Sequence, residues 1–171
     1  MYRLFLMLAL LCIANPSAGA EMLQTGDPFP AWKLVDQTGA PVSSADLKGK
    51  RYLVWFYPKA ATPGCTIEGS KLRDRSAEFR EMGVEILGVS FDPPAANLEF
   101  MKEEGFPFRL LSDERRELAA AVGAAASSSQ PTAARISYLV GADGKVLKPY
   151  PGVNPSTHAA EVLTDLAALP R

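Results

Sequence analysis

Blocks of apolar residues alternate with polar, helix-forming segments along most of this chain. Residues 51–57, 84–89 and 135–140 are rich in β-branched and aromatic side chains, which predicts buried strands. Strands that alternate with helices indicate an α/β domain in three layers, with a mixed central β-sheet flanked by helices. The sequence predicts these helices at residues 66–81, 95–104, 114–122 and 155–169.

Shorter patterns predict hairpins at the edges of this domain. The turn residues 36–39 separate the mostly apolar segment 32–35 from a short strand at 41–43, which predicts an N-terminal hairpin. A second hairpin is predicted around the turn 141–144, with its partner strand at 145–147. Residues 46–50 are expected to form a helical turn, residues 110–113 lead into the third helix, and residues 124–130 are expected to form an Ala/Ser-rich loop.

The first 20 residues have the pattern of a secretory signal peptide. Arg3 supplies a positive charge, residues 4–13 are apolar, and residues 18–20 form a small-residue cleavage site. The apolar run is shorter than the roughly 20 residues of a membrane-spanning helix, which disfavours a membrane anchor. A lipoprotein signal at Cys12 is disfavoured by the bulky leucines before it. We therefore expect that residues 1–20 are a signal peptide, that residues 21–171 form one domain, and that the protein is exported to the periplasm.

The charge balance disfavours two classes of partner. Without Arg3, 17 of the 18 basic residues remain against 19 acidic ones, a net charge of −2. No basic cluster is interleaved with aromatic residues. These features predict neither nucleic-acid binding nor stable membrane association.

The two cysteines lie in different contexts. Cys12 falls in the predicted signal peptide, so Cys65 would stand alone in an oxidising compartment and could form no internal disulfide. Cys65 follows the central strand across a turn built from Pro58, Pro63 and Gly64, where a helix begins. Unpaired backbone N–H groups and the positive end of the helix dipole favour a thiolate at such a position. This placement favours a reactive thiol over the alternative, a buried structural cysteine.

The residues around Cys65 resemble those of a known family. Pro58-x-x-x-Thr62-x-x-Cys65 is similar to the active-site pattern of peroxiredoxins. The run Phe56-Tyr57-Pro58-Lys59…Thr62-Pro63-Gly64-Cys65-Thr66-x-Glu68…Arg73-Asp74 resembles the bacterioferritin comigratory protein branch, also called peroxiredoxin Q. The resemblance covers nearly all of the chain after the predicted signal peptide. It implies a thioredoxin-like fold with the N-terminal β-hairpin as an extension.

The resemblance also implies an antioxidant thiol peroxidase with roles for individual residues. Cys65 would attack a peroxide oxygen as a thiolate and become a sulfenic acid. Thr62 would point its hydroxyl at the sulfur or the peroxide, and Arg135 would place a fixed positive charge beside them. Pro58 and Gly64 would line the substrate pocket. Without the resemblance, Arg135 would be interpreted as a solvent-facing residue at a strand end.

Two further residues are expected to support the site or to lie away from it. Glu68, one helical turn after Cys65, is expected to orient an arginine rather than to carry a proton. His158 is the only histidine, and we expect it at the surface or at a helix cap, remote from the site. One histidine and one cysteine provide no credible set of metal ligands, and we expect no cofactor.

The chain departs from the family's pattern at Ser70. Many members of this branch carry a resolving cysteine there, and this chain has a serine. We therefore expect an external thiol to reduce the oxidised Cys65: glutathione, a glutaredoxin-like or thioredoxin-like protein, or another small thiol. The expected partners are a peroxide and this thiol donor, with the protein as a monomer or weak dimer.

Two other functions stay open at this point. The first is an envelope thiol–disulfide oxidoreductase, which the missing Cys-x-x-Cys motif disfavours. The second is a non-enzymatic redox-sensing or binding domain on the same fold, which the loss of a resolving thiol favours. Peroxide consumption that depends on Cys65 would distinguish a peroxidase from both.

Overall fold

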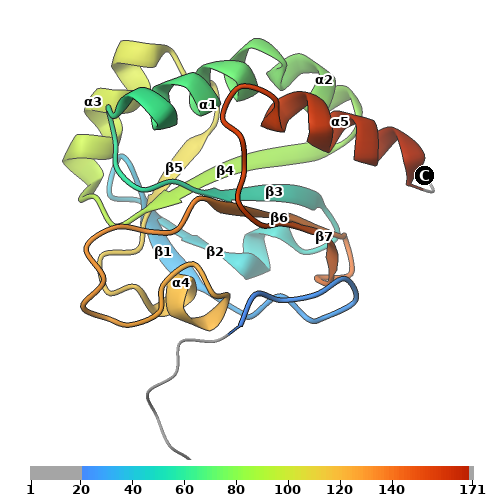
Figure 1. Ribbon diagram of the computed structural model, residues 1–171, viewed down its shortest axis with the longest axis horizontal. Coiled ribbons are helices and arrows are strands. Elements are labelled where there is room, and N and C mark those ends of the chain that lie inside the picture. Colours follow the sequence, from blue (N-terminus) through green and yellow to red (C-terminus); the bar gives the residue numbers. More distant parts are fainter. Residues whose placement is uncertain (1–20, 170–171) are drawn as a thin grey trace, which may run out of the picture.

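The centre of the molecule is a seven-stranded mixed sheet with the strand order β2-β1-β5-β4-β3-β6-β7 (Figure 1). The computed structural model describes residues 21–169, so the predicted signal peptide lies outside the described residues. The strands are β1 (Lys33–Asp36), β2 (Pro41–Ser43), β3 (Arg51–Phe56), β4 (Val84–Ser90), β5 (Arg109–Ser112), β6 (Ile136–Val140) and β7 (Val146–Tyr150). The helices are η1 (Ser44–Leu47), α1 (Pro63–Asp74), α2 (Ser76–Glu81), α3 (Pro94–Glu104), α4 (Glu117–Ala121) and α5 (His158–Ala168).

The pairing of the strands confirms the predicted mixed sheet. The central strands β3, β4 and β5 run parallel to one another. β1 joins β5 and β6 joins β3, both antiparallel. β2 and β7 complete the two edges as hairpin partners of β1 and β6, which confirms the two predicted hairpins.

The sheet is covered on both faces, and β3 shows how its sequence achieves this. Tyr52, Val54 and Phe56 belong to one hydrophobic core, whereas Leu53 and Trp55 belong to the other. Successive strand residues point to opposite faces, so a continuous apolar run fills both cores. Helices α1, α2, α3 and α5 cover one face, and α4, η1 and the N-terminal segment cover the other (Figure 1).

Several element boundaries differ from the prediction. The helix expected at 66–81 is two helices, because the backbone leaves the helical conformation at Arg75 (φ −110°). The first of the two helices begins at Pro63. Proline is compatible with this position because the N–H groups of the first helical turn have no partner within the helix. The third helix, expected at 114–122, is the shorter α4, since Arg116 directly before it takes a left-handed conformation (φ 60°). The last helix begins at His158 rather than at residue 155.

One strand, β5, was not predicted from the sequence. Residues 110–113 were expected to lead into the third helix, yet β5 covers most of this segment. Leu110 and Leu111 are both fully buried, one in each core. A strand of four residues is too short for periodicity to distinguish it from a loop. Among the described helices, none is long and apolar enough to cross a membrane.

Candidate active site

Cys65 lies in the first turn of α1, directly beyond the carboxyl end of β3. The first hydrogen bond of this helix runs from the Thr66 N–H to the Thr62 carbonyl (2.9 Å). The N–H groups of Gly64 and Cys65 precede this bond and are not used within the helix. The sulfur is therefore close to the positive end of the α1 dipole, as the sequence predicted. Cys65 itself is fully buried.

The loop before Cys65 is held in an unusual conformation. Ala61 adopts a left-handed backbone (φ 56°), which is unfavourable for a residue with a side chain. The Ala60 N–H donates to Asp92 Oδ2 (2.9 Å), which ties this loop to the end of β4. The Thr62 hydroxyl donates to the carbonyl of Lys59 (2.9 Å). The hydroxyl thus bonds the loop backbone here, and its predicted role toward peroxide stays a prediction.

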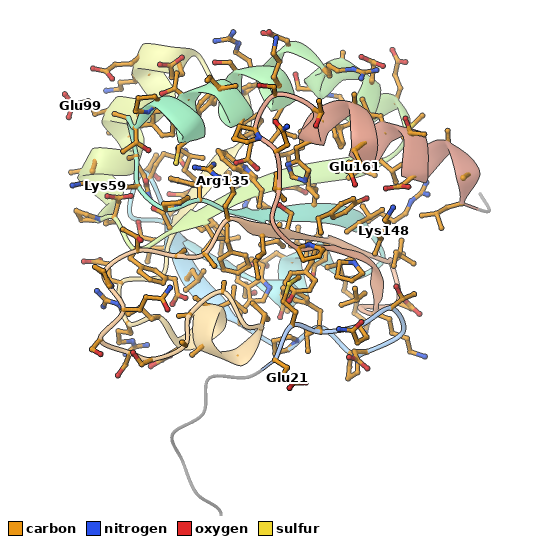
Figure 2. The ribbon with its side chains drawn as sticks, in the orientation of Figure 1. Glu21, Lys59, Glu99, Arg135, Lys148 and Glu161 are labelled. Atoms are coloured by element: carbon orange, nitrogen blue, oxygen red, sulfur yellow. The ribbon has the colours of Figure 1, made fainter. Side chains whose placement is uncertain are left out.

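Arg135 reaches the sulfur from a distant part of the chain. It immediately precedes β6, and its Nη2 lies 3.4 Å from Cys65 Sγ. Figure 2 shows Arg135 between the helical layer and the sheet. Burial by itself would lower the pKa of Arg135, but its hydrogen bonds to Cys65 and Glu68 and the charges of these two groups together raise the pKa. The guanidinium therefore remains a fixed positive charge beside the sulfur.

Gly64 provides the space that the guanidinium occupies. A Cβ atom at this position would lie 2.9 Å from Arg135 Nη2, too close for an undisturbed contact. The backbone of Gly64 is an ordinary helical one, so the requirement for glycine comes from this contact and not from φ. Pro58, the other predicted pocket residue, is half-buried at the start of the same loop.

Glu68 connects Arg135 to a residue that the sequence analysis placed elsewhere. Its carboxylate is fully buried and pairs through Oε2 with Arg135 Nη1 (2.5 Å). Its other oxygen, Oε1, lies 2.9 Å from Nδ1 of His158. The expected orientation of an arginine by Glu68 agrees with this geometry. The expectation for His158 was wrong, because this side chain is fully buried and contacts Glu68.

The sequence contained a sign of the buried His158. His158, Val162 and Leu166 are four residues apart and lie on one stripe of α5, all buried. Helical residues with this spacing share a face, so a histidine in line with two apolar residues is expected inside. Its partner Glu68 could not be identified in this way, because the two residues are 90 positions apart.

A second buried polar cluster lies under the same loop and contains no charged side chain. Asn97 of α3 is at its centre. Asn97 Oδ1 accepts hydrogen bonds from Tyr57 Oη (2.7 Å) and Ser90 Oγ (3.3 Å), and Asn97 Nδ2 donates to Ser112 Oγ (3.1 Å). Burial raises the pKa of Tyr57, so its hydroxyl stays protonated and can donate. This cluster joins the ends of β3, β4 and β5 to α3.

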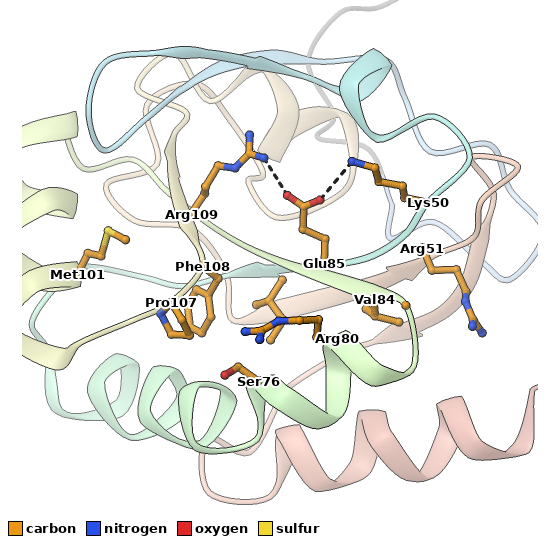
Figure 3. A pocket seen from close by; sticks show the side chains of 12 residues that line it. Lys50, Arg51, Ser76, Arg80, Val84, Glu85, Met101, Pro107, Phe108 and Arg109 are labelled. Carbon is orange, nitrogen blue, oxygen red and sulfur yellow. Dashed lines mark hydrogen bonds and ion pairs between the residues drawn. The ribbon is translucent and has the colours of Figure 1, made fainter.

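A hollow of about 640 Å³ lies at the other end of β3 (Figure 3). Its lining includes Arg51 and Val84, the first residues of β3 and β4. Basic side chains surround it, and Glu85 pairs with both Lys50 (4.0 Å) and Arg109 (3.0 Å). Cys65 follows the opposite end of β3, so this hollow is separate from the thiol site.

Comparison with known proteins agrees with this geometry. The model of the AhpC/TSA family matches residues 25–148. The chain belongs to this family of peroxiredoxins. It is 39% identical to peroxiredoxin Bcp of Escherichia coli K12 over 146 residues, which cover 82% of this chain and 94% of that relative. It is 36% identical to a putative peroxiredoxin of Mycobacterium tuberculosis H37Rv over 150 residues, 85% and 96% of the two chains.

Solved structures of peroxiredoxins share the fold. The crystal structure of peroxidoxin BcpB from Mycobacterium tuberculosis superimposes with a TM-score of 0.81 at 31% identity, covering 87% of this chain and 99% of that one. Peroxiredoxin Q of Xanthomonas campestris gives a TM-score of 0.75 at 30% identity, over 80% and 90% of the chains. The thioredoxin-like fold is thus confirmed, and this peroxiredoxin is a thiol-dependent peroxidase. The two alternative functions are not favoured.

Proposed function

We propose that this peroxiredoxin works by a one-cysteine mechanism in which Cys65 reacts with peroxide and an external thiol restores it. The contact between Arg135 Nη2 and Cys65 Sγ (3.4 Å) carries the proposal. Arg135 is half-buried, and a positive charge at this distance stabilises a thiolate and can also stabilise negative charge on a departing oxygen. Gly64 and Cys65 contribute unpaired N–H groups to the same place.

In the first step, the Cys65 thiolate attacks one oxygen of the peroxide. An S–O bond forms and the O–O bond breaks, so the sulfur is oxidised to a sulfenic acid and the peroxide is reduced. The departing oxygen leaves as an alkoxide or hydroxide and takes a proton from solvent. Thr62 and Pro58 complete the substrate pocket in this proposal, with Thr62 turning its hydroxyl from Lys59 to the peroxide.

In the second step, two molecules of an external thiol reduce the sulfenic acid. The first forms a mixed disulfide with Cys65 and releases water, and the second displaces Cys65 as a thiol and leaves with the first as a disulfide. In the described part of the chain, Cys65 is the only free cysteine. Ser70, which occupies the family's resolving position, donates instead to Glu104 Oε2 (3.4 Å).

The proposal also includes a thiol donor and a location in the cell. A small thiol such as glutathione, or a glutaredoxin-like or thioredoxin-like protein, would supply the electrons. Residues 1–20, with their single basic residue and apolar run, support export to the periplasm. There the protein would act as a monomer or weak dimer in defence against hydrogen peroxide or organic hydroperoxides.

The decisive experiment compares the wild-type chain with Cys65→Ser and Ser70→Ala. Wild type and Ser70→Ala should consume peroxide at equal rates, with two thiols oxidised per peroxide, while Cys65→Ser should show only the rate without protein. Mass spectrometry at limiting glutathione should detect one glutathione bound to Cys65. Peroxide turnover by Cys65→Ser, or a dependence on Ser70, would contradict the mechanism.

A further inference from the structure

The one histidine of the chain has no part in the mechanism so far, yet it contacts the active site. His158 is fully buried at the start of α5, with Nδ1 2.9 Å from Glu68 Oε1. We propose that His158 is a positioning residue: as a neutral hydrogen-bond donor it holds Glu68, and through Glu68 it fixes Arg135 beside Cys65. The proposal rests on the function proposed above for Arg135.

The burial of Glu68 explains why a second donor is needed. An ionised carboxylate has two oxygens that only accept hydrogen bonds, and leaving one of them buried without a partner is costly. Arg135 bonds Oε2, and His158 bonds Oε1. Without His158, the carboxylate would rotate toward another donor or take up a proton. Either change would weaken its hold on the Arg135 guanidinium.

The contacts of the imidazole assign its protonation. Because a carboxylate oxygen only accepts, Nδ1 of His158 carries the hydrogen. Nε2 is buried and has no hydrogen-bond partner among residues 21–169, so a second proton there would create a buried N–H without a partner from this part of the chain. His158 is also the first residue of α5, where the helix dipole disfavours another positive charge.

The other groups that face the imidazole agree with a neutral ring. From β7, Tyr150 packs edge-on against it with 5.5 Å between ring centroids. The Tyr150 hydroxyl donates to Asp165 Oδ2 (3.0 Å), so it is directed at Asp165. From α1, the negative charge of Glu68 is already paired with Arg135. His158 therefore acts as a neutral donor from Nδ1.

The test compares two substitutions in the otherwise unchanged full chain. His158→Leu keeps a similar volume and removes the donor, whereas His158→Asn keeps an N–H near the position of Nδ1 and cannot ionise. His158→Leu should slow the oxidation of Cys65 by hydrogen peroxide about tenfold, since a hydrogen bond to a charged group is lost. It should also lower the thiolate absorbance at neutral pH. His158→Asn should recover most of the oxidation rate and most of the thiolate absorbance.

A double-mutant comparison separates positioning from a purely structural role. In a Glu68→Gln background, His158→Leu should change the peroxide rate little further, because the coupling passes through Glu68. Equal rates for wild type and His158→Leu, or an Asn variant as slow as the Leu variant, would overturn the proposal. A failure of the proposed function would instead appear as peroxide turnover by Cys65→Ser, or as an Arg135→Ala variant with an unchanged rate.

Nuclear magnetic resonance of the wild-type chain tests the protonation without any substitution. His158 is the only histidine, so in protein without a histidine tag its imidazole signals need no assignment to a residue, and only the two ring nitrogens have to be told apart. We expect the shifts of a neutral ring with the proton on Nδ1 at neutral pH. An imidazolium, or a neutral ring with the proton on Nε2, would overturn the inference even if the variants failed to fold.

Discussion

Two polar clusters, both largely buried, lie near the loop that precedes Cys65, and they differ in charge. One consists of Glu68, Arg135 and His158, joins α1, α5 and the start of β6, and contacts the sulfur. The other, around Asn97, is neutral and joins α3 to the ends of the three parallel strands. Both are closed to solvent over most of their surface, so both depend on complete hydrogen bonding.

The difference in charge indicates that the two clusters have different roles. Neutral groups that satisfy one another stabilise a fixed arrangement without acting on a distant charge. A buried ion pair contributes little to stability compared with apolar packing, but it can fix a charge where chemistry needs it. We therefore expect the neutral cluster to hold the loop in place and the charged cluster to act on Cys65.

Removing the charge at Arg135 should have the largest effect. Arg135→Ala should slow the peroxide step by about 10²–10³-fold, as the loss of a charged donor does in other active sites. It should also reduce the thiolate fraction of Cys65, measured by ultraviolet absorbance, and destabilise the fold, since Glu68 stays buried without its ion-pair partner.

Arg135→Lys is the matched control for this change. Lysine keeps a positive charge and lacks the guanidinium fork, so it cannot reach Glu68 and Cys65 at once. It should recover part of the rate and most of the stability. If Arg135→Ala leaves the thiolate fraction and the rate unchanged, Arg135 has no part in the reaction.

A smaller change, Gly64→Ala, tests the position of the Arg135 guanidinium without removing its charge. In Gly64→Ala, the new methyl group would lie 2.9 Å from Arg135 Nη2, and the flexible guanidinium should move by a few tenths of an ångström. No functional group is lost and the backbone is unstrained, so the fold should stay intact. The peroxide step should slow by about tenfold, because catalysis is sensitive to small misplacements. An unchanged rate would mean that the guanidinium position is not critical.

The two clusters also differ in how far the sequence predicted them. Cys65 lies after a Pro/Gly turn at the start of a helix, so local patterns located it, whereas Glu68, one turn later in α1, was identified through the family resemblance. Arg135 required the family resemblance, because 70 residues separate it from Cys65. The hydrogen bonds of His158 and Asn97 were missed, since a hydrogen bond between distant elements leaves no local pattern. The burial of His158 was also missed, although its spacing from Val162 and Leu166 indicates it. The strands and hairpins were predicted from periodicity and turn residues, and the exception, β5, is too short to show a period.

A substitution in the neutral cluster should affect stability and leave the chemistry intact. Tyr57→Phe removes the hydroxyl that donates to Asn97 Oδ1, and Ser90 still donates to the same oxygen. Unfolding in urea should show a loss of about 1 kcal/mol, typical of one hydrogen bond. The peroxide rate should remain close to that of wild type. A large loss of rate with unchanged stability would show that this cluster acts on the sulfur too.

The smallest effect is expected for the oxidation of Cys65 on the folding of α1. Residues five apart in a helix have Cα atoms roughly 8–9 Å apart, from a rise of about 1.5 Å and a rotation of about 100° per residue. A disulfide requires less than about 7 Å, so relatives that pair such cysteines must unwind this helix. Ser70 cannot form that bond, and nothing traps an unwound α1 after oxidation.

We therefore expect α1 to remain folded when Cys65 becomes a sulfenic acid. Hydrogen exchange of the amides at 66–74 should be the same in the reduced and sulfenic forms, because Glu68 stays anchored to Arg135 and His158. A Ser70→Cys variant is the matched control, and its oxidised form should lose protection in these amides as the new disulfide forms. Loss of protection in the oxidised wild-type chain would show that oxidation itself releases Glu68 from its two partners.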